Sequence, residues 1–221
     1  MKSVVLLSSG LDSTVNFHEA LLQDKARGKQ NVLLCLTFDY GQRAAKKEIE
    51  NAKNQCKAHG VSHKVVELKW FSDFTNTSLV SQKMEIPTQV KIESLSASQE
   101  SAKAVWVPNR NGIFLNIAAG FAEGLGGDCI IVGFNKEEAA TFPDNTQSYL
   151  EKVNDAFEYS TANKIKVKCF TTDMDKTQIA KRAKELNVNL NWIWPCYKGG
   201  DKICGECESC SRYLRAIGTE Q

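Results

Sequence analysis

The chain has 221 residues, of which 42% are hydrophobic, and it carries a formal net charge of +2 at pH 7. This length suits one domain with a substantial core, and the nearly balanced charge lacks the basic footprint of a nucleic-acid-binding protein. The apolar runs are too short to cross a membrane or to act as a secretion signal. We therefore expect a single cytoplasmic domain over residues 1–221 with no membrane or nucleic-acid partner.

The first twenty residues contain a motif typical of a phosphate-binding loop. The apolar run Val4–Leu7 predicts a buried parallel strand, residues 8–13 predict a tight turn, and the stretch Val15–Leu22 predicts an amphipathic helix. A turn between a strand and a helix directs free N–H groups and the positive end of a helix dipole at one point, which favours phosphate binding. The alternative is an ordinary strand–turn–helix junction.

The rest of the chain alternates between predicted strands and helices. The predicted strands cover residues 32–38, 64–68, 128–134 and 165–170, and the predicted helices cover residues 42–59, 112–124, 147–159 and 176–186. A polar segment over residues 71–105 predicts a loop or short-helix insertion. This alternation indicates an α/β fold with a five-stranded parallel sheet, helices on both faces, and ligands at the carboxyl edge where the strand order reverses.

Four of the eight cysteines are clustered near the C-terminus with the spacing C-x7-C-x2-C-x2-C. They are Cys196, Cys204, Cys207 and Cys210. Four thiolates at this spacing suit a closed tetrahedral Zn²⁺ site of structural type, which would shape a tail over residues 192–215. A [4Fe–4S] cluster or disulfides are the alternatives. The scattered Cys35, Cys56, Cys129 and Cys169 are predicted to be buried small hydrophobic residues.

Polar clusters follow several predicted strands and can converge at the carboxyl edge of the sheet. Their members are Tyr40, Gln42, Arg110, Asn111, Phe142 and Asp144. Each cluster has a structural alternative as a turn or a helix cap. Arg110 has the two-pronged donor geometry that suits a carboxylate or a phosphate.

The chain resembles the QueC family of 7-cyano-7-deazaguanine synthases, which belongs to the PP-loop ATP pyrophosphatase superfamily. The motifs that carry the resemblance are S-S-G-L-D-S, D-Y-G-Q-R, V-P-N-R-N-G-I-F-L, V-G-F-N, F-P-D and the four-cysteine tail. They occur in the family's order and cover nearly the whole chain. The resemblance implies a Rossmann-like fold, one structural zinc ion and a homodimer.

The resemblance also implies a reaction that joins 7-carboxy-7-deazaguanine to ammonia at the expense of ATP. Attack of the carboxylate on the α-phosphate gives an acyl adenylate and pyrophosphate, and ammonia then displaces AMP to form an amide. A second activation of the amide oxygen leaves the nitrile, which is a precursor of queuosine. Catalysis of this kind depends mainly on positioning and charge neutralisation.

Carried over by position, the family's ATP-binding loop corresponds to Leu7, Ser8, Ser9, Gly10, Leu11, Asp12, Ser13 and Thr14. The resemblance implies that Ser13 contacts the phosphates, that Asp12 orients the loop or Mg²⁺, and that Lys176 stabilises departing pyrophosphate. A helix-capping Asp12 and a solvated Lys176 are the alternatives. The residues implied to bind substrate are Tyr40, Gln42, Arg110, Asn111, Phe142 and Asp144, and the four clustered cysteines are the implied zinc ligands.

The chain departs from the family pattern at three places. Ser9 replaces a glycine, Ala44 replaces a histidine, and Asn145-Thr146 replaces a cysteine and an arginine. Because an arginine near a substrate carboxylate is costly to lose, a divergent enzyme acting on another carboxylate or amine is one alternative. A tRNA-modifying thiolase or ligase and a non-catalytic zinc-ribbon module are the others.

Overall fold

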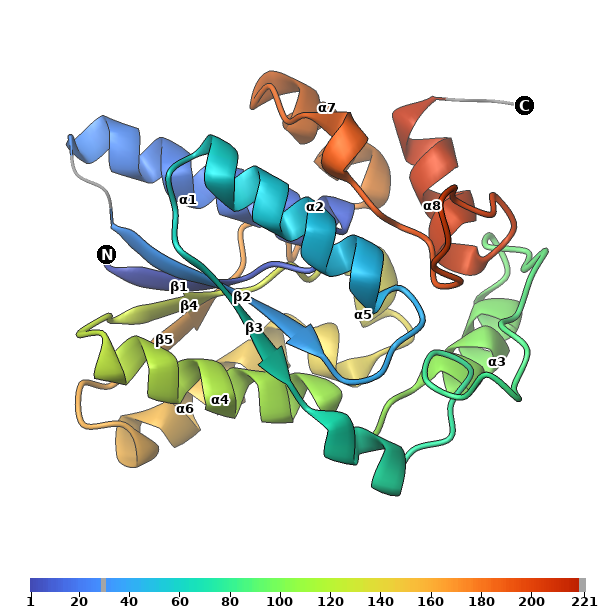
Figure 1. Cartoon of the computed structure of the whole chain (residues 1–221), viewed down its shortest axis with the longest axis horizontal. Coiled ribbons are helices and arrows are strands. Elements are labelled where there is room, and N and C mark those ends of the chain that lie inside the picture. The colour runs from blue at the N-terminus through green and yellow to red at the C-terminus, as the bar shows by residue number, and fades with distance from the viewer. Residues whose placement is uncertain (29–30, 219–221) are drawn as a thin grey trace.

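The computed structural model describes residues 1–28 and 31–218 (Figure 1). The predicted domain covers residues 1–221, and its residues 29–30 and 219–221 lie outside the described residues. Its centre is a five-stranded sheet with the order β3-β2-β1-β4-β5, in which every pairing is parallel. The strands are β1 Ser3–Leu6, β2 Val32–Asp39, β3 His63–Glu67, β4 Cys129–Ile131 and β5 Lys166–Lys168. The predicted five-stranded parallel α/β sheet is therefore confirmed.

Helices cover both faces of the sheet (Figure 1). The pair α1 (Leu11–Arg27) and α2 (Ala45–Ala58) packs on one face, and the pair α4 (Arg110–Gly124) and α6 (Gln147–Ser160) packs on the other. Successive strand residues point to opposite faces, so neighbouring strand residues belong to different cores. Val4 packs with the α4 and α6 side, whereas Val5 packs with the α1 and α2 side.

Several element boundaries differ from the sequence prediction for identifiable reasons. The helix predicted over residues 42–59 begins at Ala45, because the Gln42 side chain bonds the backbone of Tyr40 and Phe38 in a turn. The strand predicted over 128–134 ends at Ile131. The short helices α5 (Lys136–Ala139) and η2 (Pro143–Asn145) follow it.

The insertion after β3 contains two short helices and connecting loops, as the prediction of a loop or short-helix insertion allows. The helices are η1 (Lys69–Asp73) and α3 (Leu95–Val105). The Arg43 guanidinium donates to the carbonyl of Ser81 at 2.6 Å and also to that of Met84, which fastens the connecting loop to the body of the protein.

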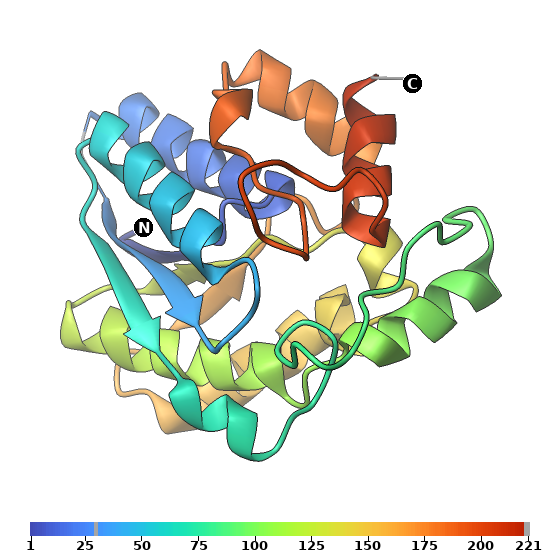
Figure 2. The same cartoon turned by 45° about the vertical axis from the view of Figure 1, so that its right-hand side comes forward.

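The C-terminal part contains α7 (Lys176–Glu185), η3 (Leu190–Trp192) and α8 (Glu208–Ile217). The sequence did not lead us to expect α8, which begins inside the cysteine cluster. It packs against α7, and Figure 2 shows α8 and α3 at the same end of the molecule. Within the ranges 1–28 and 31–218, no helix combines the length and the apolar composition that a bilayer crossing requires.

Three of the four scattered cysteines are buried as predicted. Cys35, Cys56 and Cys129 have at most 1% of their surface exposed. Cys169, which follows β5, is half-buried, and its thiol contacts the backbone of Phe134.

Candidate active site

A cavity of about 250 Å³ lies at the carboxyl ends of β1, β2 and β4, where the strand order reverses. The sequence predicted a ligand site at this edge. The cavity is lined from every side: by the β1–α1 loop, the starts of α2, α4 and α7, the insertion, and the cysteine tail. Its polar lining residues include Ser8, Asp12, Ser13, Gln42, Glu48, Arg110, Asn111, Glu138, Asp144 and Lys176.

Most of the predicted site residues lie together in this cavity. Those that line it are Leu7, Ser8, Gly10, Leu11, Asp12, Ser13, Tyr40, Gln42, Arg110, Asn111, Phe142, Asp144, Lys176 and Cys196. Ser9 and Thr14 belong to the predicted ATP loop but are buried behind it. The Thr14 hydroxyl accepts a hydrogen bond from Gln55 at 3.3 Å, and the Ser9 carbonyl accepts one from the amide of Trp194 at 2.9 Å.

The β1–α1 loop is held in a compact turn by its serines. The Ser13 hydroxyl donates to the Gly10 carbonyl at 3.1 Å and lies 3.1 Å from the Ser8 hydroxyl. Ser9 adopts a left-handed backbone with φ of 58°, a conformation that favours glycine. The QueC family has glycine at this position, where the backbone must adopt a left-handed conformation. Serine adopts the same conformation here, so the backbone at Ser9 is strained.

A close backbone approach joins this loop to β4. A Cβ atom at Gly133 would lie 2.4 Å from the amide nitrogen of Ser13, so only glycine fits there. This contact brings the first turn of α1 against the segment that carries Glu138.

A buried ion cluster lies beside the loop. The Lys176 ammonium is 2.5 Å from Asp12 Oδ2 and 3.0 Å from Glu138 Oε1, and Asn135 donates to Asp12 Oδ2 at 3.0 Å. Burial opposes the charged form of Lys176, but the two carboxylates outweigh it and raise the lysine pKa. Burial raises the pKa of Asp12. Lys176 is therefore a buried, paired cation and not a solvated lysine.

One oxygen of this cluster has no partner. Asp12 Oδ1 is buried and makes no hydrogen bond with any described residue. An unpartnered buried carboxylate oxygen is costly unless a ligand completes it. Carboxylate oxygens are the ligands that Mg²⁺ prefers, so Asp12, with Glu138 beside it, fits a magnesium ion that accompanies nucleotide phosphates.

A second set of lining residues, which we call the aromatic end of the cavity, carries aromatic rings and a cation. The Arg110 guanidinium lies 5.9 Å from the centre of the Tyr40 ring and donates to the Tyr40 hydroxyl at 3.2 Å. The rings of Trp106 and Phe142 are nearly parallel, with centroids 6.0 Å apart. Such walls suit a planar heterocycle, and the guanidinium suits a carboxylate.

Two further carboxylates lie at this aromatic end. Asp144 accepts a hydrogen bond from Asn145 at 3.0 Å, and burial raises its pKa while Arg110 lowers it. Glu48, in the first turns of α2, accepts a hydrogen bond from Gln42 Nε2 at 2.7 Å, and burial raises its pKa to about 7. We did not single out Glu48 from the sequence. Its place in the charged run K-K-E-I-E gives no signal that separates it from the neighbouring Glu50.

Gln42 lines the cavity, but its amide is fully used within the protein. Its Oε1 accepts from the Tyr40 amide at 2.9 Å, and its Nε2 donates to the Phe38 carbonyl and to Glu48. These bonds fix the turn after β2. The geometry therefore makes Gln42 a residue that positions Tyr40 and Glu48.

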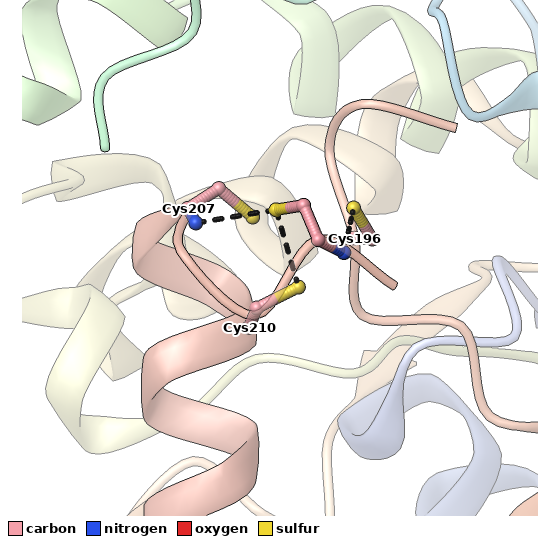
Figure 3. Close-up of side chains that lie close together, drawn as sticks. Cys196, Cys207 and Cys210 are labelled. Carbon is pink, nitrogen blue, oxygen red and sulfur yellow. Dashed lines mark hydrogen bonds between the residues drawn. The ribbon is translucent and has the colours of Figure 1, made fainter. Parts of the chain in front are cut away.

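The four clustered cysteines converge, and Figure 3 shows the side chains of Cys196, Cys207 and Cys210 directed toward a common centre. The four sulfur atoms, including that of Cys204, lie within 4.8 Å of one another. Backbone N–H groups of Cys204 and Cys207 donate to cluster sulfurs at 3.4 and 3.3 Å, an arrangement that stabilises thiolates. The donor set fits one tetrahedral metal ion.

The cysteine cluster also forms part of the cavity wall. Cys196 lines the cavity together with Trp194 and Tyr197. On its other side the cluster packs against Ile86 of the insertion, and Thr88 forms an isolated β-bridge with Cys207. A metal here would therefore tie the tail and the insertion to one side of the site.

The chain is similar to known proteins over its full length. The family profile described as "Queuosine biosynthesis protein QueC" matches residues 2–220. A protein of Bdellovibrio bacteriovorus named 7-cyano-7-deazaguanine synthase is 52% identical over 220 residues, covering 99% of this chain and 93% of the relative. A protein of the same name from Carboxydothermus hydrogenoformans is 48% identical and covers 98% of both chains.

A solved structure shares the fold. The U34-tRNA thiolase NcsA from Methanococcus maripaludis, with its [4Fe-4S] cluster, aligns with a TM-score of 0.50 at 15% identity, covering 100% of this chain and 82% of that chain. At this identity the likeness concerns the fold alone. The full-length profile match and the close relatives show more, and this chain therefore belongs to the QueC family.

Proposed function

We propose that the chain converts 7-carboxy-7-deazaguanine and ammonia to 7-cyano-7-deazaguanine with ATP, as an AMP-forming ligase. The observation that carries this proposal is a single cavity with a phosphate-type loop and buried Lys176 at one end and Arg110 among aromatic rings at the other. The names of its relatives support the same activity.

In this proposal the β1–α1 loop binds the ATP phosphates. The hydroxyls of Ser8 and Ser13 and the N–H groups at the start of α1 face the cavity and donate to phosphate oxygens. Asp12 and Glu138 would hold Mg²⁺, which when bound neutralises phosphate charge. Lys176, kept cationic by its two carboxylates, stabilises the pyrophosphate that leaves.

The heterocycle binds at the aromatic end in this proposal. Arg110 binds and orients the substrate carboxylate, and the deazapurine packs against the aromatic side chains that line this end. A carboxylate oxygen attacks the α-phosphorus of ATP, and the P–O bond to pyrophosphate breaks. Ammonia attacks the acyl carbon and AMP leaves with the bonding electron pair. The amide oxygen then attacks the α-phosphorus of a second ATP and a second pyrophosphate leaves. Breaking of the C–O bond with loss of the remaining N–H proton releases AMP and leaves the nitrile.

The family pattern has an arginine at the position of Thr146, and Arg110 is a second cation that can bind the substrate carboxylate. It provides a guanidinium in the same part of the cavity as Asn145, so a cation for the substrate carboxylate is retained. The names of the relatives support the nitrile-forming reaction over a divergent substrate. A thiolase needs a sulfur-carrying cysteine at the loop, but Cys196 is the one cavity-lining cysteine of the described residues, and it belongs to the metal set.

We also propose that the four cysteines hold one structural Zn²⁺. The closed set of four sulfurs and its spacing support zinc, which when bound supplies no reaction chemistry but crosslinks the tail. Metal analysis by mass spectrometry checks this, with one zinc per chain expected. Bound iron together with a brown colour, seen as absorption of blue light in the visible spectrum, would indicate an iron–sulfur cluster instead.

The proposal includes a homodimer in a reducing, cytoplasmic compartment. The family resemblance supports the dimer, and thiolate ligands support the compartment, since they require cysteines that stay reduced. Sedimentation or light scattering of the metal-loaded protein measures the mass, and a monomeric mass would contradict the dimer.

The reaction is tested by incubating the protein with ATP, Mg²⁺, ammonium and 7-carboxy-7-deazaguanine. We expect AMP and pyrophosphate to be released and the nitrile to be seen by mass spectrometry. Release of ADP would contradict adenylation. Turnover with another carboxylate or amine but not with this pair would assign the chain to a divergent reaction.

A further inference from the structure

We propose that Glu48 reads the amidine edge of the heterocycle, accepting hydrogen bonds from the ring N1–H and the exocyclic 2-amino group. This inference rests on the proposed function, since it assigns a specificity-determining residue to the substrate named there. It concerns a side chain for which neither the motifs nor the adenylation chemistry provides a role.

Glu48 is a carboxylate of the cavity wall without a charged partner. Its described hydrogen bond is from Gln42 Nε2 at 2.7 Å, which uses Oε2, and Glu48 is among the residues that line the cavity. Within residues 1–28 and 31–218, no ion pair includes Glu48, whereas Asp12 and Glu138 both pair with Lys176. A half-buried carboxylate that lines a cavity without an ion pair gains stabilisation when a ligand supplies donors.

The surroundings of Glu48 identify the part of the ligand that it faces. The charged groups near it are Arg110 at the start of α4 and Asp39 at the end of β2, and both influence its pKa. Arg110 in turn sits against Tyr40, which packs on Phe71 and Phe114. Glu48 therefore belongs to the aromatic end of the cavity, together with the guanidinium that receives the substrate carboxylate.

The substrate presents matching chemistry at its two ends. Its carboxylate pairs with a guanidinium, and its pyrimidine edge carries two adjacent N–H donors that one carboxylate accepts together. Arg110 and Glu48 offer these two complements in one cavity. Adenine, by contrast, places an acceptor next to its amino group and repels a carboxylate there.

Asp144 is the competing carboxylate, but it is already engaged. Its side chain receives hydrogen bonds from Asn145 and Asn111, and it lies near Arg110. Two amide groups therefore occupy Asp144, while Glu48 has an oxygen available for an N–H edge.

The ionised form of Glu48 is the form that accepts both N–H groups. Burial raises the Glu48 pKa to about 7, Gln42 and Arg110 lower it in part, and Asp39 raises it further. Tyr40, whose own pKa is raised by burial, stays neutral and adds no charge. The substrate should therefore bind more weakly as the pH falls below about 7.

The test compares Glu48→Gln with wild type and with the control Glu50→Gln. Glu50 lies on the same helix with 53% of its side chain exposed. We expect Glu48→Gln to raise the KM for 7-carboxy-7-deazaguanine about 10- to 100-fold, because charge-assisted hydrogen bonds are lost, with the KM for ATP within about twofold. Glu50→Gln should change neither. A raised KM for ATP alone, or an unchanged KM for the heterocycle, would overturn the assignment.

A second substrate keeps the test independent of the variant's folding. The analogue that lacks the 2-amino group should have a kcat/KM about 10-fold or more below that of the full substrate with wild type. With Glu48→Gln the two substrates should differ far less. Equal turnover of both by wild type would refute the inference, whereas a wild type without any AMP release would refute the proposed function instead.

The pH profile gives a third readout. In wild type the KM for the heterocycle should rise below about pH 7, and this dependence should vanish in Glu48→Gln. A KM for ATP that falls at low pH would show a protonated Glu48 pairing with adenine, which contradicts the inference.

Discussion

The two ends of the cavity differ in how their charged side chains are paired. At the phosphate end, Lys176 forms ion pairs with Asp12 and Glu138, so its charge is balanced before any ligand binds. At the aromatic end, Arg110 and Glu48 make no ion pair with any residue of the described ranges. The first end must rearrange its charges when ATP and a cation bind, whereas the second is completed by the substrate itself.

This difference indicates which end determines the rate of the reaction and which end determines substrate specificity. A preformed ion cluster keeps the lysine charged and placed, but a phosphate must compete with two carboxylates for it. Unpaired groups that face a cavity gain their full interaction energy only when a complementary ligand arrives. We therefore expect the phosphate end to govern kcat and the aromatic end to govern substrate choice.

The largest effect should come from breaking the phosphate end at its cation. Lys176→Met removes the charge that stabilises departing pyrophosphate and leaves the Asp12 and Glu138 carboxylates repelling each other. We expect kcat to fall by about 10³-fold or more, measured as pyrophosphate release. Lys181→Met, on the exposed surface of the same helix, is the control and should keep wild-type activity. A Lys176→Met enzyme with near-normal kcat would show that the cluster is only structural.

Breaking the metal site tests whether the cysteine tail supports the aromatic end. Cys207→Ser removes a buried ligand, so bound zinc should be lost and the tail should unfold locally. Because Trp194 and Cys196 line the cavity, activity should fall about 100-fold while the sheet remains folded by circular dichroism. Cys169→Ser, outside the cluster, should retain zinc. Full activity of zinc-free protein would separate the tail from the site.

Arg110→Lys tests whether the aromatic end binds the substrate carboxylate, and it keeps the positive charge. Lysine keeps the cation but lacks the planar fork that pairs with a carboxylate through two bonds. We expect the KM for 7-carboxy-7-deazaguanine to rise about 10-fold and the KM for ATP to change little. If the KM for ATP rises instead, Arg110 belongs to the nucleotide, and the division of the cavity into two ends is wrong.

The strands and the loop could be predicted from the sequence because each has a local signal. Apolar runs mark β1 and β2, and small residues between a strand and a helix mark the phosphate loop. The four cysteines have a spacing that few other patterns share. These features depend on neighbours in the chain, so no tertiary information is needed to find them.

The remaining features depend on contacts that the sequence does not display. The helix α8 begins at Glu208 with a cysteine as its N-cap, so the metal-site spacing conceals its amphipathic pattern. Glu48 lies in the charged run K-K-E-I-E, where nothing distinguishes it from the exposed Glu50. The pairing of Lys176 with Asp12 brings together opposite ends of the chain, and only the fold reveals it.

The smallest effect concerns the strain stored at the phosphate end. Ser9 adopts φ of 58°, and its buried hydroxyl has no partner among the described residues, so Ser9→Gly should relieve both costs. We expect the free energy of unfolding to rise by about 1 kcal/mol, after the greater flexibility of glycine in the unfolded chain is subtracted. Urea denaturation measures it, with Ser96→Gly in α3 as the control that should lose stability. A loss of stability in Ser9→Gly would mean that the serine contributes a contact to the loop, and that the phosphate end is more completely satisfied than its geometry indicates.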